Sequence, residues 1–182
     1  LQRQSPIRDL RLNRLIIYDK NTKTMISINN LQKKFGEKLA VNIDHYEINQ
    51  GDMLGLVGNN GAGKTTMIRL LTGLAEPTTG KIALFGESNK KLAKQRERIG
   101  CIIESPSLYL DMTAYENLEV QRLQRGIPGK GCIDNALALV GLKDTGKKKA
   151  KDFSLGMRQR LALAIALLGN PEFLVLDEPI NG

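Results

Sequence analysis

A glycine-rich stretch in the first half of the chain constrains the fold more than any other feature. Residues 58–65 read Gly-Asn-Asn-Gly-Ala-Gly-Lys-Thr, which matches the pattern G-x-x-x-x-G-K-[ST] of loops whose backbone N–H groups surround phosphates. The apolar run from Asp52 to Val57 predicts a short strand before it, and the apolar spacing over 64–74 predicts a helix after it. A strand that leads through such a loop into a helix predicts an α/β fold.

The loop residues have separate expected roles in binding a nucleotide. Lys64 offers a point charge to the β- and γ-phosphates, and the Thr65 hydroxyl can hold Mg²⁺. The helix dipole adds to the attraction for anions. A chance glycine-rich turn is the alternative, and the flanking strand and helix argue against it. The residues assigned to nucleotide binding here are Gly58, Asn59, Asn60, Gly61, Ala62, Gly63, Lys64, Thr65 and Thr66.

The rest of the chain shows strands first and helices later. From Met25 onward, apolar residues alternate in two segments, which indicates an antiparallel β-rich region. Further strands are expected at 81–86, 99–103 and 173–176, and helices at 89–98, 113–125, 132–140 and 157–168. We expect a helical insertion at about 105–168. Residues 1–24 have no clear period, and we expect them to be a non-native or disordered segment.

Composition excludes several classes of protein. Hydrophobic residues make up 41% and charged residues 25% of the 182 residues, which is typical of a globular chain. The longest apolar run, from Leu161 to Leu168, is too short to span a bilayer. Two cysteines make no disulfide framework, so a reducing cytoplasmic location is expected. Aromatic residues are only 4%, so we expect no nucleic-acid partner, despite the net charge of +8.

A carboxylate pair follows the last predicted strand, in the sequence Leu-Val-Leu-Asp-Glu-Pro at 174–179. Asp177 can reach the Mg²⁺ held by Thr65, and Glu178 can polarise an attacking water. Two acidic residues that simply begin a loop are the alternative, and the phosphate loop makes it less attractive.

The segment Phe-Ser-Leu-Gly-Met-Arg-Gln-Arg at 153–160 completes a pattern that resembles the ATP-binding subunits of ABC transporters over about residues 25–182. In that family two such domains pair head to tail, and the signature serine and glycine close over the nucleotide of the partner domain. The resemblance therefore assigns this role to Ser154 and Gly156, although Leu155 and Met157 depart from the usual Leu-Ser-Gly-Gly-Gln. A simple helix N-cap is the alternative. Phe35 corresponds to the aromatic residue that stacks on adenine, with an ordinary turn residue as the alternative.

Glu104 stands where the family usually has a glutamine that touches Mg²⁺ and the attacking water. With the variant signature, it makes the chain resemble the branch that exports or gives immunity to bacitracin-like and lantibiotic peptide antibiotics. The resemblance gives Glu104 a catalytic role and makes Thr65, Glu104 and Asp177 the expected metal ligands. A plain loop glutamate is the alternative.

The resemblance implies a P-loop NTPase with a RecA-like core, an antiparallel β-subdomain and a helical signature subdomain. The chain stops before the family's Leu-Asp loop and switch histidine, so we expect a C-terminally truncated, incomplete domain over 25–182. The implied cofactors are ATP and Mg²⁺. The implied partners are a second copy of the domain and a membrane permease at the inner face of the cell membrane. A cytosolic ABC-type ATPase acting on ribosomes or DNA and a non-catalytic nucleotide-binding fragment remain the alternatives.

Overall fold

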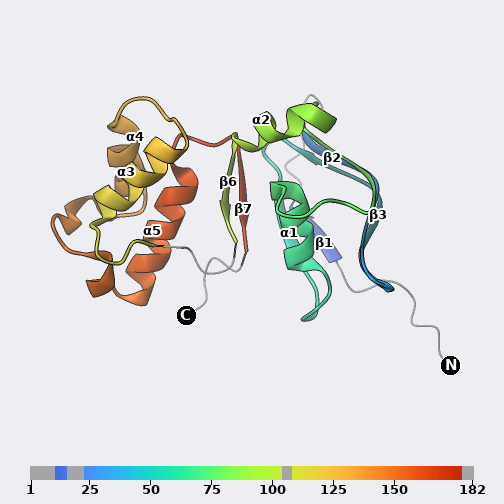
Figure 1. The fold of residues 1–182 in the computed structure, drawn as a ribbon, viewed down its shortest axis with the longest axis horizontal. Helices are drawn as coiled ribbons and strands as arrows, with labels where there is room; N and C mark the ends of the chain where they lie inside the picture. Colours follow the sequence, from blue (N-terminus) through green and yellow to red (C-terminus); the bar gives the residue numbers. More distant parts are fainter. Residues whose placement is uncertain (1–10, 16–22, 104–107, 178–182) are drawn as a thin grey trace. The chain divides into compact units, whose positions relative to one another are not determined.

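The structure, a computed structural model, describes residues 11–15, 23–103 and 108–177. The chain divides into two compact units, Leu1–Arg96 and Glu97–Gly182, each of which is described separately below. Figure 1 shows the elements of each unit in the order of the chain.

An antiparallel sheet of three strands forms the centre of the first unit, in the order β3-β2-β5. The strands are β2 (Thr24–Phe35), β3 (Lys38–Asn49) and β5 (Thr79–Leu84). Strands β2 and β3 form a hairpin in which Phe35 pairs with Lys38. The buried apolar side chains of this sheet include Ile26, Ile28, Leu31, Val41 and Leu84. The prediction of an antiparallel β-rich region after Met25 is therefore confirmed.

A second pair of strands leads to the glycine-rich loop. Strand β4 (Met53–Val57), which the sequence predicts, pairs antiparallel with β1 (Arg11–Leu15), for which the sequence predicts no secondary structure. The pairing rests on backbone hydrogen bonds, which need no alternation of side chains and so leave little trace in a sequence. The predicted strand is confirmed, and its apolar residues Met53 and Val57 are more than half exposed.

Helix α1 (Lys64–Thr72) follows the loop, and its predicted apolar face is buried at Met67, Leu70 and Leu71. It ends at Gly73, whose φ of 81° is left-handed, so Leu74 lies beyond the helix and is 68% exposed. The helix expected at 89–98 is shorter: a 3₁₀ turn, η1 (Asn89–Lys91), precedes the five-residue helix α2 (Leu92–Arg96).

A parallel pair of strands, β6 (Ile99–Ile102) and β7 (Phe173–Leu176), opens the second unit, as the sequence predicts. Helix α5 (Leu155–Leu167) covers one face, where Ala162 and Ala166 pack on Ile102. The approach is so close that a Cβ atom on Gly100 would overlap the carbonyl oxygen of Ala166.

The remaining helices of the second unit are α3 (Ala114–Gln124), α4 (Gly131–Leu139) and the 3₁₀ turns η2 (Lys143–Thr145) and η3 (Ala150–Asp152). They enclose an apolar core with α5. Figure 1 shows α3, α4 and α5 grouped together. Its fully buried members include Leu118, Ile133, Leu142 and Leu161. The predicted helices of this region are confirmed. No helix in the described part of the chain has the length and apolarity that crossing a bilayer requires.

Candidate functional site

The glycine-rich loop connects β4 to α1, as the sequence predicts, and two of its glycines have left-handed backbone conformations. Gly61 has φ 81° and Gly63, the N-cap of α1, has φ 95°. A Cβ atom on Gly63 would also overlap the carbonyl oxygen of Ala40 in β3. Gly63 is thus required by its conformation and by its neighbour, because a side chain is disfavoured at such φ values. Ala40 is a part of the site that the motif does not reveal.

The Lys64 side chain forms hydrogen bonds within the loop. Its ammonium group donates to the carbonyl oxygens of Gly58 at 2.7 Å and Asn59 at 3.1 Å. An ammonium group has three donors, so one remains for a phosphate oxygen. These contacts hold the charge beside the start of α1, where the first turn contains no acidic residue. The first-turn N–H groups and the helix dipole favour an anion at this point.

Thr65 and Thr66 lie in the first turn of α1 and are partly buried. A hydroxyl oxygen there is a suitable ligand for Mg²⁺, which commonly takes one or two protein oxygens together with phosphate and water oxygens. No cluster of three or more His, Cys, Asp or Glu side chains that could hold a metal lies within residues 11–15, 23–103 and 108–177.

Phe35 lies at the end of β2, next to Gly36 in the hairpin turn, and is 55% exposed. The Lys33 ammonium lies 5.1 Å from the centroid of the ring and also donates to the carbonyl of Glu76 at 2.8 Å. This cation gives the ring one polar neighbour while leaving it accessible. An exposed ring of this kind can stack on a purine base.

Asp177 follows β7 in the second unit, and its N–H donates to the carbonyl of Ile102 at 2.8 Å. That bond extends the ladder between β6 and β7 by one residue and fixes the backbone from which the carboxylate projects. Asp177 is partly buried. Glu104 and Glu178, the two residues for which the sequence predicts a catalytic role, lie outside the described residues.

Ser154 is the N-cap of α5, where its Oγ accepts from the N–H of Met157 at 3.3 Å. This confirms the N-cap geometry, and it leaves the hydroxyl proton available to donate to an anion. At Gly156 a Cβ atom would have no neighbouring atom within 4 Å, and Leu155 is 62% exposed. The beginning of α5 is therefore an accessible surface.

The predicted residues fall into two groups. The loop 58–66 and Phe35 belong to the unit Leu1–Arg96, and Ser154, Gly156 and Asp177 belong to the unit Glu97–Gly182. The roles of the individual residues remain predictions.

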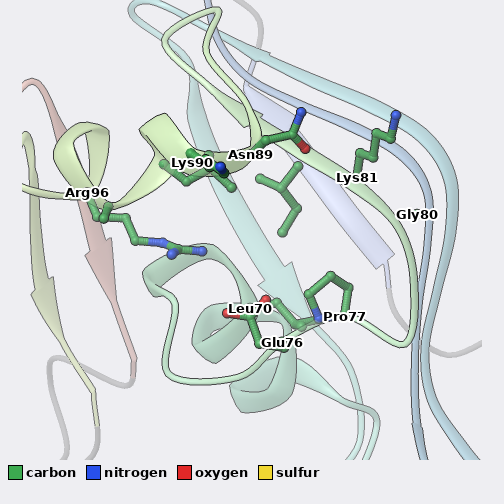
Figure 2. A pocket seen from close by; sticks show the side chains of 11 residues that line it. Leu70, Glu76, Pro77, Gly80, Lys81, Asn89, Lys90 and Arg96 are labelled. Carbon is green, nitrogen blue, oxygen red and sulfur yellow. The ribbon is translucent and has the colours of Figure 1, made fainter.

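A pocket of about 430 Å³ in the first unit lies apart from the loop. Figure 2 shows it between α1, α2 and β5, with Arg96 pointing into the space above α1. Its lining combines the charged residues Glu76, Lys81, Lys90 and Arg96 with apolar side chains, and includes no residue of 58–66.

Comparisons with known proteins found similar sequences. The family model described as ABC transporter matches residues 41–181. The chain is 49% identical over 162 residues to the bacitracin transport ATP-binding protein BcrA of Bacillus licheniformis, covering 87% of this chain and 52% of BcrA. It is 40% identical over 158 residues to the lantibiotic transport ATP-binding protein SrtF of Streptococcus pyogenes, covering 87% of this chain and 68% of SrtF. The chain thus spans about half the length of BcrA.

Solved structures share the fold. CbiO1 of Clostridium perfringens, part of the ABC transporter complex CbiONQ, superposes with a TM-score of 0.73 at 24% identity, over 86% of this chain and 66% of that chain. A dimeric ATP-binding cassette in a post-hydrolysis state, bound to ADP and Pi, gives a TM-score of 0.66 at 25% identity, over 85% of this chain and 74% of that chain. The α/β fold with a phosphate loop, predicted from the sequence, is thereby confirmed.

Proposed function

Because this chain belongs to the ABC transporter family, we propose that it is the ATP-binding part of a transporter subunit that couples ATP hydrolysis to the export of a peptide antibiotic. The observation that carries the proposal is the loop 58–65, with Gly63 packed against the Ala40 carbonyl and the Lys64 ammonium held at the start of α1. This arrangement supports binding of the β- and γ-phosphates of ATP.

Phe35 and the phosphate loop supply the binding part of the proposal. Both lie in the unit Leu1–Arg96. The exposed ring stacks on adenine, and the loop amides with Lys64 hold the phosphates. The Thr65 hydroxyl would be a ligand for Mg²⁺ bound together with ATP, and the ion would neutralise charge on the phosphate oxygens. Stacking on a ring selects weakly among purines, so the phosphates contribute most of the affinity.

The hydrolysis part of the proposal involves Glu104 and the two acidic residues that follow β7. The carboxylates of Asp177 and Glu104 would be further ligands for Mg²⁺, which would neutralise charge on the γ-phosphate. Glu178 would orient the attacking water and accept its proton. The negative charge of Glu104 opposes that of the phosphates, which makes turnover depend more strongly on metal concentration.

A second copy of the domain completes the site in this proposal. Ser154 and Gly156 of one copy contact the γ-phosphate bound by the other, with the dipole of α5 aimed at it. The accessible beginning of α5 and its available hydroxyl proton support this role. The pair of domains associates with a membrane permease at the cytoplasmic face of the membrane.

The relatives support the choice of substrate class. BcrA and SrtF are transport proteins for bacitracin and for a lantibiotic, and their identities of 49% and 40% extend over most of this chain. Both substrates are peptide antibiotics, so we propose a substrate of that class.

The test uses the intact transporter with its permease, and compares wild type with Glu178→Gln. The amide cannot accept the proton of the attacking water, whereas the phosphate loop is unchanged. We expect unaltered ATP affinity, ATP turnover reduced by about 10²-fold or more, and loss of protection against bacitracin or a lantibiotic in a sensitive host. Lys94→Ala, an exposed change in the same chain, is the control. Full protection by Glu178→Gln would refute the coupling of hydrolysis to export, and a wild-type protein without turnover would favour a non-catalytic nucleotide-binding role.

A further inference from the structure

The short segment that leads into Ser154 is held by backbone hydrogen bonds from a distant loop. The N–H of Ala150 donates to the carbonyl of Met112 at 2.8 Å, and the N–H of Lys151 donates to the carbonyl of Leu110 at 2.9 Å. Ala150 is fully buried, and Phe153 is 4% exposed. The backbone just before the signature serine is therefore tied to residues 109–113.

Asn117 of α3 in turn holds that loop. Its side chain is buried, with 1% exposure. Its Oδ1 accepts from the N–H of Tyr109 at 2.8 Å, and its Nδ2 donates to the carbonyls of Tyr109 at 3.0 Å and Thr113 at 2.9 Å. One amide group thus contacts both ends of the loop, and removing it would take away the acceptor of the Tyr109 N–H and one donor to each of the two carbonyls.

Arg158 of α5 contacts the same segment, residues 150 and 151, through its side chain. It lies in the first turn of α5, and its guanidinium donates from Nη2 to the carbonyl of Lys151 at 2.7 Å and from Nε to that of Ala150 at 3.3 Å. The N–H groups of residues 150 and 151 are therefore bound to the loop, while their carbonyls are bound to α5. Such double attachment leaves little freedom for Ser154, which follows within one turn of chain.

We propose that Asn117 and Arg158 are positioning residues that hold Ser154 where its hydroxyl can meet the γ-phosphate of a nucleotide in a second copy of the domain. This inference rests on the function proposed above. Neither residue touches the nucleotide. Both act through the backbone of residues 150–151, which we call the clamp segment.

Other contacts of the region contribute less to this positioning. The pair of Lys151 and Asp111 at 3.0 Å has side chains that are 55% and 87% exposed, and exposed pairs of this kind contribute little to stability. The hydrogen bonds with the backbone of residues 150 and 151 matter more here, because they act directly on the chain that leads to Ser154.

The experiment compares Arg158→Met, Arg158→Lys and Asn117→Ser in the intact transporter. Methionine keeps the apolar stem of arginine without its donors, and lysine keeps the charge with a different donor geometry. Lys147→Met is the matched control, because it removes a nearby exposed charge for which no partner lies within the described residues. Three quantities are measured: amide hydrogen exchange at residues 150 and 151, ATP affinity, and the kcat of ATP hydrolysis.

We expect Arg158→Met to exchange the clamp-segment amides on the order of tenfold faster and to lower kcat by a similar factor, while ATP affinity stays at the wild-type value. Arg158→Lys should recover part of both effects. Asn117→Ser should act in the same direction with a larger loss, and Lys147→Met should match wild type. Because Asn117 is buried, the arginine variants keep the test informative if the asparagine variant does not fold.

Two results would overturn the inference. Unchanged exchange in Arg158→Met would show that the side chain does not hold the clamp segment, and faster exchange with unchanged kcat would show that holding it does not position Ser154. A wild-type protein that forms no ATP-dependent dimer would instead refute the proposed role of Ser154 in a second copy. The exchange measurement needs no ATP, so the two failures can be told apart.

Discussion

Replacing Gly63 with alanine tests whether the phosphate loop depends on its close contact with β3. The change adds one methyl group at a residue with φ 95°, directly against the carbonyl oxygen of Ala40. Gly61→Ala is a matched control, because Gly61 has φ 81° in the same loop and nothing lies within 4 Å of its Cβ position. The two variants share the conformational strain and differ in the steric overlap.

The magnitude follows from these two contributions. A side chain in the left-handed region costs about 1–2 kcal/mol, which applies to both variants. Overlap with a backbone atom of the three-stranded sheet adds about 1–3 kcal/mol, because either β3 or the loop must shift. We therefore expect Gly61→Ala to lose about 1–2 kcal/mol and Gly63→Ala to lose about 2–5 kcal/mol of local stability.

Native-state hydrogen exchange at increasing urea concentration is the suitable assay, read at the amides of α1 and β3. The chain has no tryptophan and two compact units, so a single fluorescence transition would not report on the loop. An ATP titration in parallel should show the larger loss of affinity for Gly63→Ala. Equal losses of stability in the two variants would refute the reasoning, because the contact with Ala40 would then have no energetic consequence.

Three further predictions concern other parts of the chain. Lys64→Ala should weaken ATP binding by about 1.5–3 kcal/mol, since a charged donor is lost, and calorimetric titration against Lys94→Ala measures it. The N–H of Thr113 donates to the Glu116 carboxylate and holds the pKa of Glu116 below its usual range. The stabilisation that this carboxylate gives to the start of α3 is therefore present at neutral pH and is lost as the pH falls through the folded-state pKa. Glu116→Gln should remove this pH dependence from hydrogen exchange in α3. Gly100→Ala should loosen the packing of α5 on β6 and cost about 1–3 kcal/mol, which faster exchange in both elements would show; unchanged exchange would contradict the overlap with Ala166.

Local sequence patterns predict most of the helices and strands. The errors occur where specific contacts determine whether an element forms or where it begins and ends. Helix α5 begins at Leu155, two residues before the expected start, because the Ser154 hydroxyl caps it. The expected helix at 89–98 is interrupted, and Asn89 has a positive φ of 59°, which a pattern of charged residues does not indicate. Strand β1 escapes prediction because backbone pairing with β4 defines it.

The candidate site likewise contains residues that can be recognised from the sequence and residues that cannot. The loop 58–65 can be recognised because its residues are contiguous, and the N-cap at Ser154 because its partner is three residues away. Ala40, Lys33 and Arg158 cannot be recognised, since their contacts involve backbone carbonyls and an aromatic ring. Any sequence can supply a carbonyl, so no residue type signals such a partner.

The hydrogen bonds of Lys64 within its own loop have a consequence for the loop when no phosphate is bound. The ammonium lies within reach of the Gly58 and Asn59 carbonyls, so it has acceptors other than phosphate and water. When no phosphate is bound, two donors of the ammonium group still have these carbonyl oxygens as acceptors, so the cation keeps hydrogen-bond partners within the protein. The same two hydrogen bonds tie the side chain to the loop, and we expect the loop to keep its conformation before a nucleotide binds.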